Sequence, residues 1–212
     1  MVGQGVLREC LLDSAVEHVL SVVRSTTTQQ HPNVVELVRK DLFAYSDVEA
    51  QLTGYDACFF CLGVTSSGMT EQDYSHVTYD LTMAAAETLA RLNPTMTFVY
   101  VSGQGTDSSE KARAMWARVK GKTENALLRI PFKAAYMFRP GVIQPIGGVQ
   151  SKTASYRVLY SVAKPLLPAL RRIFPQYVTT TELLGRAMIR VVRGGYPKRI
   201  LESRDINEVA GR

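Results

Sequence analysis

Mostly apolar runs alternate with longer segments of mixed polarity along much of the chain. The runs at residues 57–62, 97–101 and 134–139 have no regular polar face. Such runs are typical of strands buried on both faces of a parallel sheet. Helices are predicted between them, at about 72–92 and in a segment that ends near Leu128. The pattern predicts an α/β fold with a doubly wound parallel sheet, Rossmann-like in its layering.

Shorter elements are predicted toward the two ends of the chain. Val6–Leu12 is predicted as a helix, and residues 19–24 and 34–38 are short β-rich runs. A last regular helix is expected at 180–192.

The regular alternation loosens after residue 148. We therefore expect residues 1–149 to form the sheet core and residues 150–212 a small lobe of the same domain on the substrate side. Residues 156–174 are apolar and basic but are interrupted by two prolines. Contact with an anionic membrane is a weaker interpretation of this stretch than a lobe that covers a substrate.

Composition narrows the class of protein further. The 212 residues are 46% hydrophobic and carry a net charge of +6 that is spread along the chain, which argues only weakly for a nucleic-acid partner. An odd count of three cysteines indicates a reduced protein. With no apolar run long enough to cross a membrane, we expect a soluble, cytoplasmic protein that does not bind nucleic acid.

Two features near the start of the chain point to a dinucleotide. Gly3-Gln4-Gly5 precedes the predicted helix, where the last glycine of a dinucleotide-binding loop allows close packing and the helix N-terminus holds a pyrophosphate. Arg24 ends the next β-rich run, where an arginine accommodates a 2′-phosphate and so favours NADP over NAD. A helix-start glycine and an ordinary exposed arginine are the alternatives.

Cys58 and Cys61 have the two-residue spacing of redox and zinc pairs. They lie inside a predicted buried strand rather than at the start of a helix, and His31 and His76 add no metal-ligand spacing. We interpret both cysteines as core thiols and predict no metal site.

A third group of residues suggests proton-transfer chemistry. Ser102 follows a buried strand, and Trp116 and Lys120 lie one helical turn apart on the next helix. In such an array a tyrosine is the general acid or base, a lysine lowers its pKa and binds the nicotinamide ribose, and a serine orients the carbonyl. Here the aromatic residue is Trp116, whose indole cannot exchange a proton at neutral pH. A solvated basic helix face is the alternative.

Together these residues resemble the atypical branch of the short-chain dehydrogenase/reductase superfamily, which is related to nucleoside-diphosphate-sugar epimerases and the Tat-interacting oxidoreductase. The likeness runs through Gly3, Arg24, Asp41-Leu42, Cys61-Leu62-Gly63, Val101-Ser102, Lys120-Gly121-Lys122 and Arg139-Pro140-Gly141-Val142.

The resemblance implies a role for each of these positions. Arg24 would bind the adenosine 2′-phosphate, with Asp41 and Leu42 beside the adenine. Leu62 and Gly63 would pass beneath the cofactor ribose. The segment Pro140-Gly141-Val142 would contact the nicotinamide side.

Ser102 and Lys120 match two members of the catalytic set of this family, and Trp116 stands at the position of its tyrosine. Tyr100 and Tyr136 lie in predicted strands, and Tyr74 or Tyr79 would have to reach from another helix.

The resemblance implies an NADP-binding protein, with NAD as the second choice, that acts as an epimerase or oxidoreductase on a small carbonyl or nucleotide-sugar substrate. The alternative is a non-catalytic cofactor-sensing or protein-interaction module, which Trp116 favours. A homo-oligomer is compatible with either function.

A doubly wound sheet has a central strand ahead of its first helix, and none precedes that helix here. We expect a slot between neighbouring strands, with unpaired backbone groups along both edges. We also expect Met1 to be an internal methionine of a longer natural protein whose preceding residues encode that strand and a Gly-x-x-Gly.

Overall fold

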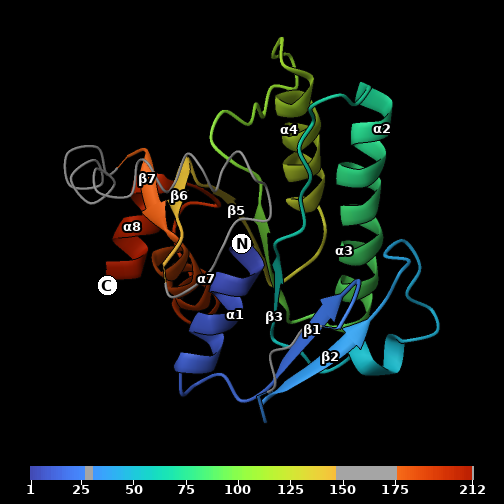
Figure 1. Cartoon of the computed structure of the whole chain (residues 1–212), viewed down its shortest axis with the longest axis vertical. Helices are drawn as coiled ribbons and strands as arrows, with labels where there is room; N and C mark the ends of the chain where they lie inside the picture. Colours follow the sequence, from blue (N-terminus) through green and yellow to red (C-terminus); the bar gives the residue numbers. More distant parts are fainter. Residues whose placement is uncertain (27–30, 147–175, 212) are drawn as a thin grey trace.

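The computed structural model describes residues 1–26, 31–146 and 176–211 (Figure 1). Its main sheet has four parallel strands in the order β3-β4-β5-β8. These are Ala57–Phe60, Thr97–Val101, Ala134–Arg139 and Ile200–Glu202. The two middle strands match the predicted apolar runs in full, because both of their faces are buried.

Alternate residues of the central strands supply the two halves of the core. Phe98, Tyr100 and Met137 pack on one face of the sheet, whereas Val99 and Phe138 pack on the other. All five side chains are almost completely buried. This arrangement requires apolar residues at every position, which explains the absence of polar alternation in the sequence.

Helices cover both faces of the main sheet (Figure 1). Three lie on one side: α1 (Val2–Leu12), α7 (Thr181–Gly194) and α8 (Ser203–Gly211). The other side has α2 (Glu71–Ser75), α3 (Leu81–Leu92) and α4 (Met115–Leu127). The predicted doubly wound α/β class is confirmed.

Two further strands form a separate parallel pair. β1 (Val19–Val23) pairs with β2 (Val34–Val38). Among the described residues, no ladder of hydrogen bonds joins β1 to β3, although Leu20 of β1 and Cys58 of β3 pack against the same core cluster. The sequence predicted a break in the sheet at this point, and the structure has it.

A third short parallel pair lies between β5 and β8 in the order of the chain. β6 (Val142–Gln144) pairs with β7 (Val178–Thr180). A 3-10 turn, η1 (Glu49–Leu52), lies between β2 and β3 in the chain.

The first predicted helix boundary was wrong. α1 begins at Val2 rather than Val6, so Gly3 and Gly5 lie inside the helix and not in a loop before it. A Cβ atom at Gly5 would lie 2.6 Å from Cβ of Thr181. Close packing of α1 on α7 therefore favours glycine inside this helix, although glycine has low helix propensity.

Two other boundaries also differ from the prediction. The helix expected at 72–92 is interrupted by a π-helical turn, η2 (His76–Asp80). The helix expected to be last is followed by β8 and α8, because a three-residue strand is too short to give a clear apolar run. β8 pairs with β5 and is therefore a strand of the main sheet.

The apolar, basic stretch at 156–174 lies outside the described residues. No helix in the described ranges is both long and apolar enough to cross a membrane.

Candidate functional site

The predicted site residues gather where parallel strands end. Leu62 and Gly63 follow β3, Ser102 follows β4, and Pro140 follows β5. The carboxyl ends of parallel strands meet at one edge of the sheet, which is where ligands of open α/β sheets bind. The chain order of these residues therefore brings them to a common edge.

Ser102 has its hydroxyl directed into the protein. The side chain is only 4% exposed, and its Oγ donates to Oε1 of Glu124 at 2.5 Å. The backbone carbonyl of Phe138 lies 3.2 Å from the same oxygen. A hydroxyl that donates to a buried carboxylate is not presented to a ligand, so this geometry does not support the carbonyl-orienting role predicted for Ser102.

Glu124 holds the centre of a buried polar cluster that sequence reasoning missed. It is completely buried, and the Nε of Arg139 donates to its two oxygens at 3.0 and 3.2 Å. Arg139 also donates to Oγ of Ser108 at 2.6 Å. The only sequence signal was the spacing of Lys120 and Glu124, which puts both on one face of α4.

Lys120 extends from α4 to the carboxyl end of β4. Its ammonium group donates to the backbone carbonyl of Ser102 and lies 3.8 Å from the position that a Cβ at Gly103 would occupy. Burial lowers the pKa of Lys120, and the neighbouring Glu124 carboxylate partly opposes that effect. The amine is thus held at the sheet edge beside a residue without a side chain.

Trp116 is half-buried under the loop that follows Ser102. A carbon of its indole lies 3.1 Å from the Cβ position of Gly105, whose φ of +86° favours glycine. The indole N–H donates only. Trp116 therefore forms a wall of the loop and offers no group for proton transfer.

The tyrosines weighed as substitutes are mostly in the core. Tyr74, Tyr100 and Tyr136 are 2% exposed or less, and burial raises the pKa of Tyr74 and Tyr100. The ring of Tyr79 lies 4.3 Å from Nζ of Lys122. The three buried hydroxyls do not face a ligand.

Gly141, just after β5, is in very close contact with neighbouring segments of the chain. Its N–H donates to Oγ of Ser203 at 2.8 Å. A Cβ there would lie 2.5 Å from the carbonyl oxygen of Tyr177 and would also meet the side-chain oxygen of Gln104. Pro140 is buried next to it, whereas Val142 is 44% exposed. The predicted nicotinamide-side segment thus has a flat backbone and one exposed apolar side chain.

The residues predicted for the adenosine end differ in exposure. Arg24 is exposed just after β1, and Asp41 is exposed just after β2. Asp41 Oδ1 accepts the N–H of Phe43 at 2.8 Å. Leu42 is 6% exposed, so its side chain belongs to the core and only its backbone is placed to meet a ligand.

Gly3 and the end of β3 meet at the start of α1. The Cβ position of Gly3 lies 3.5 Å from Cβ of Cys61, so helix and strand approach closely. Leu62 is 41% exposed, and a Cβ at Gly63 would have no atom within 4 Å. This part of the edge is therefore open, with an apolar side chain beside it.

The three cysteines pack in or against the two halves of the core. Burial raises the pKa of Cys10, Cys58 and Cys61 to about 12. In the ranges that the structure describes, no group of three histidine, cysteine or acidic side chains is placed to hold a metal ion.

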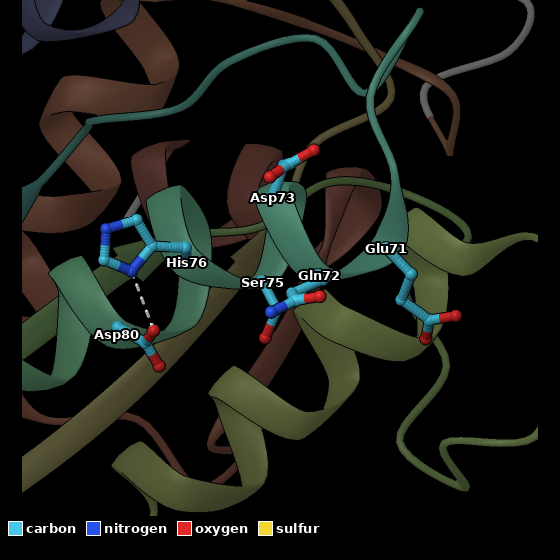
Figure 2. Close-up of a pocket in the computed structure, with 6 residues that line it drawn as sticks. All are labelled: Glu71, Gln72, Asp73, Ser75, His76 and Asp80. Atoms are coloured by element: carbon cyan, nitrogen blue, oxygen red, sulfur yellow. Dashed lines mark hydrogen bonds and ion pairs between the residues drawn. The ribbon is translucent and has the colours of Figure 1, made fainter.

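A separate hollow of about 610 Å³ lies along α2 and η2 (Figure 2). Half of the residues that line it are acidic, and His76 Nδ1 lies 3.0 Å from Asp80 Oδ2. The residues that line it are Glu71, Gln72, Asp73, Ser75, His76 and Asp80. None of the predicted site residues is among them.

Comparison with curated proteins gives distant relatives. The chain is 34% identical over 113 residues to "Botcinic acid biosynthesis cluster B protein 16" of Botryotinia fuckeliana, covering 49% of the chain and 70% of that protein. It is 27% identical over 143 residues to "Protein HTATIP2" of Rattus norvegicus, covering 66% and 58%. The chain spans about six tenths of the length of the first curated relatives it matches. No family model matches it.

Solved structures share the fold. The Bordetella bronchiseptica enzyme WbmF, in a complex with NAD+, matches 98% of the chain and 73% of its own chain, with a TM-score of 0.64 at 15% identity. The parallel sheet with helices on both faces is thus that of a Rossmann-type protein. Within that class, the chain belongs to the short-chain dehydrogenase/reductase family, in its atypical branch.

Proposed function

We propose that the chain binds NADP at the carboxyl edge of its sheet and acts as an atypical oxidoreductase or epimerase. The observation that carries this proposal is the Lys120 ammonium group, which is fixed at the end of β4 beside Gly103. One structural neighbour was solved in complex with NAD+, and another in complex with UDP-N-acetylmuramic acid. A nicotinamide dinucleotide and a carbonyl or nucleotide-sugar substrate are the ligands we infer from these neighbours.

The described residues fit a dinucleotide. Gly63 leaves open space beside the exposed Leu62, and Val142 adds an exposed apolar side chain on the other side of β4. The backbone at Gly141 has no room for a side chain. A flat, partly apolar edge with one ammonium group suits a ribose and a nicotinamide ring.

In this proposal each residue has a limited task. NADP supplies or accepts a hydride when it is bound. Lys120 binds the ribose hydroxyls through its ammonium group and adds positive charge near the ring. Arg24 pairs with the 2′-phosphate of the adenosine. Neither Trp116 nor the inward-facing hydroxyl of Ser102 delivers a proton to substrate, so water or another donor has that role.

A second candidate function is a cofactor-binding module without catalysis. Two features favour it: Trp116 stands where the resemblance implies a tyrosine, and the Ser102 hydroxyl donates to Glu124. The substitution Trp116→Tyr tests for an enzyme that has lost its acid. A gain of NADPH oxidation with a panel of carbonyl substrates supports such an enzyme, whereas an unchanged background is compatible with both functions.

Binding itself is tested by calorimetric titration with NADPH and NADH. We expect NADPH to bind more tightly, and the preference to disappear in Arg24→Ala, because only the 2′-phosphate distinguishes the two ligands. Equal affinities in the unmodified chain would contradict the role of Arg24. Absence of binding by both would contradict the proposed function.

Three further inferences remain part of the proposal. They are the division into a core at 1–149 and a lobe at 150–212, a cytoplasmic location, and a homo-oligomeric state. Limited proteolysis, cell fractionation and analytical ultracentrifugation test them in turn.

A further inference from the structure

Gln104 lies in a tight turn at the start of the loop between β4 and α4. Glycines flank it on both sides, with φ of +132° at Gly103 and +86° at Gly105, values that L side chains rarely adopt. The N–H of Gln104 donates to the carbonyl of Pro140 at 2.9 Å, and the N–H of Thr106 donates to the carbonyl of Gly103 at 3.2 Å. The backbone of the loop is thus fixed to the end of β5.

The side chain of Gln104 lies against Gly141. Its Oε1 is the first atom that a Cβ at Gly141 would meet, and its Cδ lies 3.4 Å from that position. Gln104 is exposed, and the described residues make no hydrogen bond to its carboxamide. A primary amide thus lies on a flat backbone, with Oε1 against Gly141 and with no hydrogen bond from the described residues.

Three other side chains lie near Gln104 at this edge of the sheet. Lys120 Nζ lies 3.8 Å from the Cβ position of the adjoining Gly103. Trp116 packs on Gly105 from the other side. The hydroxyl of Ser102 is directed inward to Glu124. This part of the edge thus has the ammonium group of Lys120, from α4, beside Gly103 and the amide of Gln104 one residue further along the loop.

We propose that the carboxamide of Gln104 binds the carboxamide of the nicotinamide ring, an inference that rests on the proposed binding of NADP. A primary amide has N–H donors beside a carbonyl acceptor, so two such groups are complementary and pair through two hydrogen bonds. A substrate carbonyl offers only acceptors and would leave the oxygen of Gln104 unmatched. Gln104 is therefore a cofactor-contacting residue that orients the ring above Gly141.

The test compares two ligands that differ by the nicotinamide. Isothermal calorimetry measures the dissociation constants of NADP and of 2′-phospho-ADP-ribose for the full chain and for Gln104→Ala. We expect the substitution to weaken the binding of NADP about three- to tenfold, which is the scale of one or two neutral hydrogen bonds. The affinity for 2′-phospho-ADP-ribose should not change. The same comparison is made with NAD and ADP-ribose, which lack the 2′-phosphate, so its contribution to affinity is removed.

Two further variants sharpen the result. Gln104→Glu keeps the shape of the side chain, but an ionised carboxylate cannot donate a hydrogen bond. This variant should therefore weaken NADP binding at least as much as Gln104→Ala. Gln51→Ala removes an exposed glutamine from η1 and should change neither ligand. An equal loss for both ligands, or no loss for NADP, would overturn the role of Gln104. If neither ligand binds to the unmodified chain, the proposed function itself is wrong.

Discussion

The hydroxyl of Ser102 and the carboxylate of Glu124 are 2.5 Å apart in the interior, directly beneath the edge where ligands are expected. Glu124 is completely buried and is also hydrogen-bonded to Arg139. The residue predicted to act on substrate is therefore part of the support of the site. Residues that stabilise this edge of the sheet from beneath are thus distinct from residues that would contact a ligand.

Removal of the buried carboxylate should destabilise the fold strongly. Glu124→Ala leaves the Arg139 guanidinium without its main partner in a mostly buried position, which costs about 3–5 kcal/mol of unfolding free energy. Urea denaturation measures the change. Glu49→Ala, which breaks the exposed pair with Arg91, is the control and should have no measurable effect. Similar losses in both variants would contradict the structural role of Glu124.

Ser102→Ala should affect stability more than binding. The substitution removes a hydrogen bond to a buried carboxylate, worth about 1.5–3 kcal/mol, but no group that faces the ligand. We expect NADPH affinity to change less than twofold, whereas Lys120→Met weakens it at least tenfold. Calorimetry and urea denaturation on the same preparations give both quantities. A large affinity loss in Ser102→Ala at unchanged stability would restore its predicted role at the ligand.

Gly5→Ala should destabilise the contact between α1 and α7. The added Cβ would lie 2.6 Å from Cβ of the buried Thr181, and such overpacking costs about 1–3 kcal/mol. Gly194→Ala is the matched control, because its Cβ would meet no atom within 4 Å. Thermal unfolding distinguishes them. A fall in Tm for Gly194→Ala alone would contradict this packing.

The break in the sheet predicts uneven hydrogen exchange. Backbone amides of β3 that point toward β4 are paired, whereas those on the side of β1 have no strand partner among the described residues. We expect alternate amides of residues 57–60 to exchange much faster than those of residues 98–100. Exchange measured by NMR tests this. Uniform protection along β3 would show that its second edge is covered.

The parts of the fold predicted well from sequence are those decided by burial alone. Thr97–Val101 and Ala134–Arg139 were placed correctly because both faces of these strands are covered, and the break beside β1 followed from the order of elements. The start of α1 was missed because contact with Thr181, far along the chain, favours Gly5 within the helix.

The candidate site was predictable in position but not in detail. The ammonium group of Lys120 reaches the carbonyl of Ser102 at the end of β4, and its role toward a ligand stays a prediction. The direction of the Ser102 hydroxyl depends on Glu124 and Arg139, which come from α4 and β5, and no local pattern reports such a contact. Gln104 was missed for the same reason, since its significance depends on Gly141.

Energy transfer from Trp116 to bound NADPH tests the central claim most directly. Trp116 is the only tryptophan and packs on Gly105 in the loop beside Lys120, so its emission reports ligands at this edge of the sheet. We predict saturable quenching of Trp116 with matching sensitised emission from NADPH, and a large rightward shift of the titration in Lys120→Met. Calorimetric binding of NADPH that leaves Trp116 emission unchanged, or that is equally tight in Lys120→Met, would show that the dinucleotide binds elsewhere.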